Sequence, residues 1–193
     1  MRPEGPVGAE AVRRNPDSKL VLRAIAAAID RAMPRCGAVT VVAIDGGAAS
    51  GKSTLAAIIV AELDDAAIVH TNDLLDGWSD QLKYWPRLRE QILRPLATGR
   101  PGYYRRYDWE VGEFAEDVAV PVRKTLIVEG VSAIAATGDR LSVGIMIDVP
   151  RAERERRWIE RDGPMQPEWK TWLDNEDRHF AVPPDAPTLI VLP

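Results

Sequence analysis

The sequence is poor in the residues that build disulfides and transition-metal sites. It has one cysteine, Cys36, and two histidines among 193 residues. A single cysteine excludes an intramolecular disulfide and a four-cysteine zinc site, and two histidines leave no ligand set for a transition metal. This composition suits the reducing cytoplasm, where we expect a soluble protein.

Long apolar runs and an excess of positive charge are also missing. No apolar stretch approaches the roughly 20 residues that cross a bilayer as a helix, and residues 1–17 lack the apolar centre of a secretory signal. The formal net charge of −4 argues against general affinity for nucleic acid or anionic membranes. We therefore expect neither partner, and nuclease or helicase function is disfavoured.

The chain has the length of one ordinary domain. Residues 1–17 combine prolines, glycines and charges, which predicts a flexible N-terminal tail before a single domain over residues 18–193. Apolar, β-branched runs predict strands at 39–44, 67–70, 126–129, 142–149 and 188–192. Helical spacing predicts helices at 18–33, 53–63, 81–96, 151–161 and 168–180. This alternation predicts an α/β fold with a parallel sheet, helices on both faces, and ligands at the carboxyl ends of the strands.

The most informative segment, residues 46–53, fills every fixed position of the phosphate-binding pattern G-x-x-x-x-G-K-[ST]. Glycines let backbone N–H groups approach phosphate oxygens, and the N-terminus of the following helix favours an anion. Lys52 adds positive charge for the β- and γ-phosphates, and the Ser53 hydroxyl is expected to bind Mg²⁺. The expected nucleotide-binding residues are Gly46, Gly47, Ala48, Ala49, Ser50, Gly51, Lys52, Ser53 and Thr54. The segment predicts a binding site for a nucleotide triphosphate.

An acidic residue ends the predicted strand at 126–129. Glu129 precedes Gly130, so its carboxylate is expected beside the phosphate loop if the two strands are close in space. A carboxylate there can hold Mg²⁺ directly or through water. The alternative is a strand-terminal acid that is merely solvated.

Four blocks of the sequence, residues 44–54, 72–74, 126–130 and 154–162, resemble the uridine kinase and nicotinamide riboside kinase group of P-loop kinases. Together they span nearly the whole of residues 39–193, although only the first block is specific alone. The resemblance implies a five-stranded parallel sheet, transfer of the ATP γ-phosphate to a hydroxyl, and a small mobile lid over the phosphates.

In this family an aspartate after the second strand accepts the proton of the acceptor hydroxyl, and Asn72 occupies that position here. An amide cannot act as a base. The adjacent Asp73 could take over if the turn aims it inward. Phosphoryl transfer also depends more on positioning and charge than on a strong base, so a weakened base need not abolish activity. We therefore expect Asp73, with Asn72, at the acceptor hydroxyl; the alternative is that these residues cap the turn.

Two further groups of residues match the family's site. Arg154, Arg157 and Arg161 share one helix face, where the resemblance implies lid arginines at the ATP phosphates, although interspersed glutamates also suit a solvated, salt-bridged helix. The segment 105–109 resembles the acceptor site, in which an aromatic ring faces the base and an acid holds sugar hydroxyls. Its expected substrate-binding residues are Arg106, Tyr107, Asp108 and Trp109. For the aromatic pair, a role as a core anchor is the alternative.

The sequence thus predicts an ATP- and Mg²⁺-dependent kinase of a small hydroxylated molecule, with a nucleoside favoured. The expected catalytic residues are Lys52, Asp73, Glu129 and Arg157. A nucleotide-binding module or pseudokinase with little turnover stays open because of Asn72. So does a kinase of a non-nucleoside metabolite, since the acceptor is chosen by loops.

Overall fold

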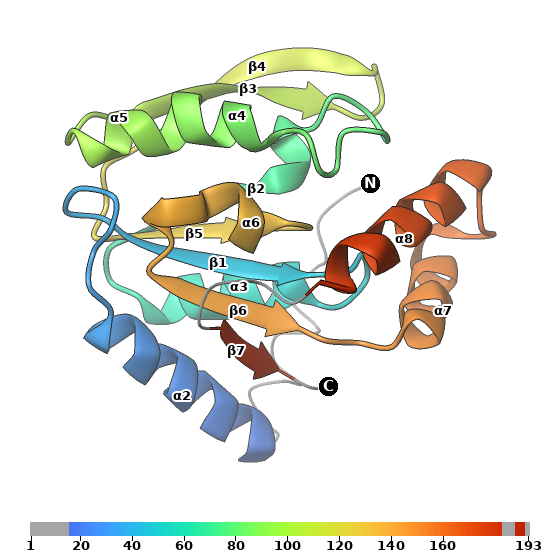
Figure 1. The fold of residues 1–193 in the computed structure, drawn as a ribbon, viewed down its shortest axis with the longest axis horizontal. Coiled ribbons are helices and arrows are strands. Elements are labelled where there is room, and N and C mark those ends of the chain that lie inside the picture. The colour runs from blue at the N-terminus through green and yellow to red at the C-terminus, as the bar shows by residue number, and fades with distance from the viewer. Residues whose placement is uncertain (1–15, 183–187, 192–193) are drawn as a thin grey trace.

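The computed structural model describes residues 16–182 and 188–191, and it confirms an α/β fold with a parallel sheet and helices (Figure 1). The strands of the sheet are β1 (Thr40–Gly46), β2 (Ala66–His70), β5 (Thr125–Glu129), β6 (Val143–Ile147) and β7 (Thr188–Val191). Their order is β2-β5-β1-β6-β7, and every neighbouring pair is parallel. The strand that leads into the phosphate loop is therefore central.

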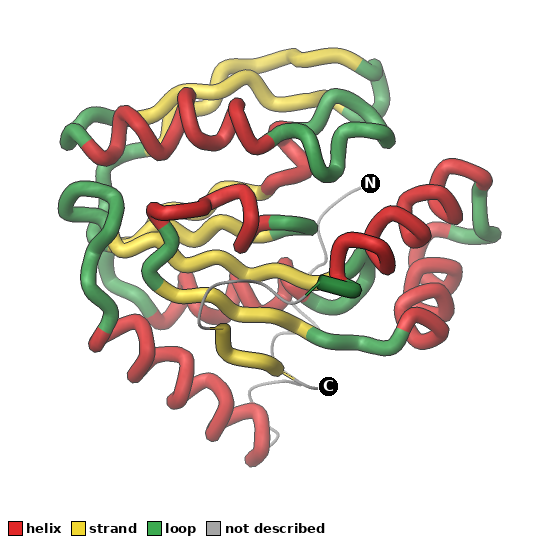
Figure 2. Tube along the Cα trace, in the orientation of Figure 1, coloured by secondary structure: helices red, strands yellow, loops and turns green. Residues whose placement is uncertain are grey.

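Helices cover both faces of this sheet and one of its ends (Figures 1 and 2). The helical segments are α2 (Pro16–Arg31), α3 (Lys52–Glu62), η1 (Thr71–Leu74), α4 (Trp85–Arg87), η2 (Leu88–Leu93), α5 (Arg94–Ala97), α6 (Ala133–Thr137), η3 (Gly138–Arg140), α7 (Arg151–Asp162) and α8 (Pro167–Phe180). In Figure 1, α7 and α8 stand at the end toward which the arrows of β1 and β6 point. Among the described residues, no helix is both long and apolar enough to span a bilayer.

Strand β1 explains why the sheet is covered on both sides. Successive side chains of a strand point to opposite faces of the sheet, and all residues of β1 are buried. Both faces of the sheet are therefore covered at this strand. Val41 and Ala43 belong to one apolar cluster, which also contains residues of η2, α6 and α8. Val42 and Ile44 belong to a second cluster, with residues of α2 and α3. Burial on two faces fixes the strand from which the phosphate loop starts.

Three expectations about the elements need correction. A hairpin of β3 (Gly102–Asp108) and β4 (Glu113–Val120) forms a separate antiparallel sheet that was not anticipated, because charged residues interrupt the apolar pattern of both strands. The helix expected at 81–96 begins at Trp85 and is π-helical in its centre. Helix α2 begins at Pro16, inside the expected tail, whereas residues 1–15 and Leu192 lie outside the described residues.

Candidate active site

The phosphate loop joins β1 to the first turn of α3, as the sequence predicts. Its backbone has positive φ at Gly46 (140°), Ala49 (60°) and Gly51 (96°). A Cβ atom at Gly46 would also lie 2.5 Å from the carbonyl oxygen of Ile147 in β6. The first glycine of the pattern is therefore required by both conformation and space.

Two side chains of the loop are buried within it. The Nζ atom of Lys52 donates to the carbonyl oxygen of Gly47 at 2.8 Å. The Oγ atom of Ser50 is buried and has no hydrogen-bond partner among the described residues, which is costly unless a ligand or water supplies one. Thr54 is half-buried in the first turn of α3. The expected nucleotide-binding residues 46–54 thus run from the carboxyl end of β1 into the first turn of α3.

Glu129 lies beside this loop because β5 pairs with β1 in parallel. The Oγ atom of Ser53 donates to Glu129 Oε1 at 3.1 Å, and His70 Nδ1 lies 2.6 Å from the same oxygen. Burial alone would raise the pKa of Glu129, but the hydrogen bond with His70 and the charge of Lys52 outweigh burial and lower it. These contacts hold Glu129 as a carboxylate.

The Ser53 and Glu129 oxygens suit Mg²⁺, which prefers hard oxygen ligands and is commonly held by one or two protein carboxylates together with substrate phosphates and water. Within residues 16–182 and 188–191, no group of three or more His, Cys, Asp or Glu side chains is arranged to hold a metal alone. Ser53 and Glu129 supply two oxygens, and phosphate oxygens or water would supply the others.

Asp73 is the inward-facing acid of the turn after β2. It lies in η1, and Tyr104 of β3 donates its hydroxyl to Asp73 Oδ2 at 2.9 Å. Burial raises the pKa of Asp73, and the opposing effects of the Tyr104 hydrogen bond and the His70 charge are smaller. Asn72 is exposed, and its carbonyl oxygen accepts from Trp109 Nε1 at 3.2 Å. Of the two adjacent residues, Asp73 is therefore better placed to meet an acceptor.

Of the three α7 arginines that were expected at the ATP phosphates, one reaches the phosphate loop. The buried guanidinium of Arg154 occupies the space that a Cβ atom at Gly47 would need. Arg157 instead donates to Glu153 Oε1 at 2.7 Å, and Arg161 pairs with Asp162 at 2.7 Å. The phosphate-binding roles of Arg157 and Arg161 stay predictions, since both pair with acids of their own helix.

The expected acceptor segment occupies the hairpin and its turn. Arg106 is half-exposed and forms an ion pair with Glu116 of β4. The Oδ1 atom of Asp108 accepts the backbone N–H groups of Glu110 and Val111 at 2.8 and 3.2 Å. Asp108 thus stabilises its own turn here, and its expected contact with substrate hydroxyls stays a prediction.

Aromatic rings form a continuous row next to this turn. The ring of Tyr107 contacts Trp109 edge-on with centroids 5.1 Å apart, Trp109 contacts Trp78 at 5.0 Å, and Trp78 contacts Trp172 of α8 at 5.7 Å. Tyr107 is buried, whereas Trp78 and Trp109 retain exposed surface. The row links the hairpin to the C-terminal helix.

An open pocket of about 330 Å³ adjoins this row at Phe114, whose ring contacts Tyr107. Its lining residues are Arg87, Gln91, Tyr103, Tyr104, Arg105, Phe114 and Asp117. Tyr104 is shared between this pocket and Asp73. Tyr104 therefore connects the pocket to the expected acceptor residue.

Asp45 is a site residue that the sequence reasoning missed. Its Oδ1 accepts the N–H groups of Gly46 at 2.7 Å and Ser132 at 2.8 Å, and its Oδ2 accepts the N–H of Ile134 at 3.0 Å. It thereby ties the first glycine of the loop to the segment after β5. The available signal was an acid at the end of an otherwise apolar strand.

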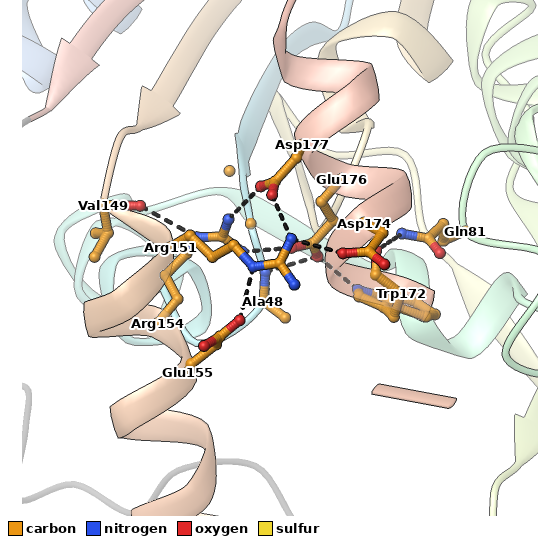
Figure 3. A network of polar contacts seen from close by, with 12 residues as sticks. Ala48, Gln81, Val149, Arg151, Arg154, Glu155, Trp172, Asp174, Glu176 and Asp177 are labelled. Atoms are coloured by element: carbon orange, nitrogen blue, oxygen red, sulfur yellow. Dashed lines mark hydrogen bonds and ion pairs between the residues drawn. The ribbon is translucent and has the colours of Figure 1, made fainter. Parts of the chain in front are cut away.

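Glu176 of α8 was missed as well, and Figure 3 shows the polar network around it. Its Oε1 accepts the backbone N–H of Ala48 at 2.8 Å and the Trp172 indole N–H at 2.5 Å. Its Oε2 accepts from Arg154 Nη1 at 2.5 Å. The available signal was its place four residues after Trp172 and three after Leu173, on the buried face of α8.

Comparison with solved structures identifies the fold. A uridine kinase candidate from Bacillus stearothermophilus matches with a TM-score of 0.57 and 17% identity, over 89% of this chain and 95% of that chain. A candidate fructose transport system kinase from Silicibacter sp. TM1040 matches with a TM-score of 0.56 and 20% identity, over 88% and 97%. No protein-family model and no curated protein matches the sequence. The likeness to solved structures confirms, at the level of the fold, the resemblance to P-loop kinases.

Proposed function

We propose that this protein is a kinase that uses ATP and Mg²⁺ to phosphorylate a hydroxyl of a small molecule, with a nucleoside as the favoured acceptor. The observation that carries the proposal is the meeting of three groups at one sheet edge: a complete phosphate loop, the Ser53–Glu129 pair and the half-buried Asp73. The kinase descriptions of the two structural neighbours support it. We expect it to act in the cytoplasm.

In this proposal, positively charged groups bind the triphosphate and a carboxylate accepts the proton of the acceptor. The loop N–H groups and Lys52 bind the phosphates, and Ser53 and Glu129 would hold Mg²⁺, which would supply positive charge next to the triphosphate. The acceptor oxygen forms a bond to the γ-phosphorus, the bond from that phosphorus to the bridging oxygen breaks, and ADP leaves. Asp73 takes the hydroxyl proton, and its raised pKa suits that role. Tyr104 is a positioning residue, since it acts through Asp73.

The acceptor is proposed to lie between Asp73 and the aromatic row. The exposed surface of Trp78 and Trp109 offers faces on which a planar base can stack, and Arg106 is close enough to affect the pKa of Asp73 by its charge. The same surface would also accept a non-nucleoside metabolite with an apolar face. A pooled panel of nucleosides, sugars and vitamins therefore decides the acceptor class.

The test is ADP release from Mg²⁺-ATP with that panel, followed by product mass. A product heavier by one phosphoryl group is the expected result. Asp73→Asn should lower kcat by about 100-fold or more, in line with the loss of a general base. One change in the same turn, Asp76→Asn, serves as the control and should change kcat little, because the Asp76 side chain is exposed. A wild-type protein that binds no ATP would refute the proposal.

A second function, a nucleotide-binding module with little turnover, is favoured by one observation. Asn72 stands where the family resemblance places an aspartate. This alternative predicts measurable ATP binding without acceptor-dependent ADP release. It also predicts that Asn72→Asp creates a large gain in phosphoryl transfer, whereas a kinase that uses Asp73 should show little change in kcat.

A further inference from the structure

Helix α8 places a carboxylate directly on the phosphate loop. Glu176 is fully buried, and the N–H of Ala48, one of the loop groups expected to bind phosphate, donates to it. Burial raises the pKa of Glu176, and the positive charges of Lys52 and Arg154 oppose this rise. Glu176 thus accepts a loop donor that an anionic ligand would use, next to the positive charges that would attract that ligand.

A phosphate and this carboxylate cannot both use these groups fully. A backbone N–H directs one strong hydrogen bond, so a phosphate oxygen at Ala48 must replace Glu176 Oε1 there. Two anions brought together in a buried site also repel each other strongly. Binding of a phosphate at Ala48 therefore requires Glu176 to leave.

Arg154 would change partner in the same event. Its guanidinium lies over Gly47, and its Nη1 atom donates to Glu176 Oε2 at 2.5 Å. When Glu176 leaves, a buried guanidinium next to the loop lacks its closest acceptor, and a phosphate oxygen can replace it. One carboxylate therefore controls both a loop donor and the arginine.

The contacts of α8 extend from this carboxylate to the expected acceptor side. Gln81 donates to the carbonyl oxygen of Trp172 at 3.1 Å and accepts from Asn175 at 3.2 Å. Trp78 contacts the ring of Trp172, which in turn donates to Glu176. A shift of α8 would therefore reach the aromatic row at which the acceptor is proposed to bind.

We propose that Glu176 competes with phosphate for the loop. Its carboxylate accepts the Ala48 N–H in the free protein, and a nucleotide phosphate replaces it there. Arg154 then exchanges its ion pair with Glu176 for one with the nucleotide. This inference deepens the proposed function and rests on nucleotide binding by the loop. Glu176 thereby limits the affinity of the loop for nucleotide.

The test compares the affinities of wild type and Glu176→Gln for the non-hydrolysable analogue AMP-PNP and for adenosine, with Mg²⁺ present. The variant keeps the side-chain size and loses the charge. Its Kd for AMP-PNP should fall by about tenfold or more, because a buried like charge is removed. Its Kd for adenosine should not change. Asp174→Asn is the matched control, since Asp174 lies on the same helix and pairs with Arg151.

A folded Glu176→Gln protein with an unchanged or higher Kd for AMP-PNP would overturn the inference. If that variant does not fold, Trp172→Phe removes one donor to Glu176 and keeps the carboxylate. It should lower the Kd for AMP-PNP about threefold. Nucleotide binding is expected to change the tryptophan emission of the wild type, and this change should be absent from the variant. If neither change occurs, the inference is also overturned. A wild-type protein that does not bind AMP-PNP would instead refute the proposed function itself.

Discussion

The buried carboxylate of Asp45 should make the stability of this protein depend on pH in an unusual direction. Burial, the largest effect, raises its pKa to about 6, despite the opposing N–H groups of Ile134 and Gly46 and the charge of Lys52. In the unfolded chain an aspartate has a pKa of about 3.9. The folded state therefore binds this proton more tightly, and Asp45 contributes increasing stability as the pH falls from above 6 toward 4.

The size of the effect follows from the two pKa values. A folded value of about 6 and an unfolded value near 3.9 give about 2 kcal/mol of added stability between pH 7.5 and pH 4.5. Asp45→Asn removes this titration. The free energy of unfolding of the wild type minus that of the variant should therefore be about 2 kcal/mol larger at pH 4.5 than at pH 7.5. The loss of the hydrogen bond to Ile134 affects both pH values equally and does not change this difference.

Urea unfolding at 25 °C, at both pH values, measures this difference. Asp139→Asn, a change at a carboxylate whose side chain is 91% exposed, serves as the control and should give no comparable pH-dependent difference. If the difference for Asp45→Asn is flat, or increases with pH, then the hydrogen bonds to Asp45 outweigh its burial and the reasoning is refuted.

Three further predictions concern the same sheet edge and its core. Gly130→Ala should cost more than about 3 kcal/mol, because its φ is 146° and the new Cβ would overlap Thr71 Oγ1; an unchanged urea midpoint would contradict this. Ile58→Ala should cost about 2–5 kcal/mol by leaving a cavity under α3, where Ile58 is 1% exposed; the same urea assay measures it. Ser53→Ala should raise the Mg²⁺ concentration needed for half-maximal ADP release about tenfold, because the proposed metal site would lose one of its oxygen ligands; an unchanged Mg²⁺ titration would remove Ser53 from the proposed metal site.

The parts of the site that could be predicted depend on local sequence or on strand register. Residues 46–53 could be recognised because the phosphate-binding pattern fixes its own backbone, and the flanking strand and helix have clear periodicity. The place of Glu129 followed from the rule that parallel strands end at one edge, and the pairing of β5 with β1 agrees. Neither inference needed a contact between distant side chains.

The parts that were missed depend on such contacts. Glu176 meets Ala48 across 128 positions of sequence, and no local pattern encodes that approach. Helical spacing placed Arg154, Arg157 and Arg161 on one face but could not show which acids each would meet. The hairpin was hidden because its strands are held by pairing with each other, and the alternating burial of β3 is interrupted by a bulge between Arg105 and Tyr107.

The close approach of Arg154 to Gly47 has a consequence for sequence variation. The missing side chain at position 47 gives the guanidinium its room, although Gly47 does not have the positive φ that would by itself demand glycine. Residues 47 and 154 therefore share one volume. In proteins of this fold, a larger residue at the second loop position should accompany a shorter side chain, or an arginine from another helical turn, at the position of Arg154.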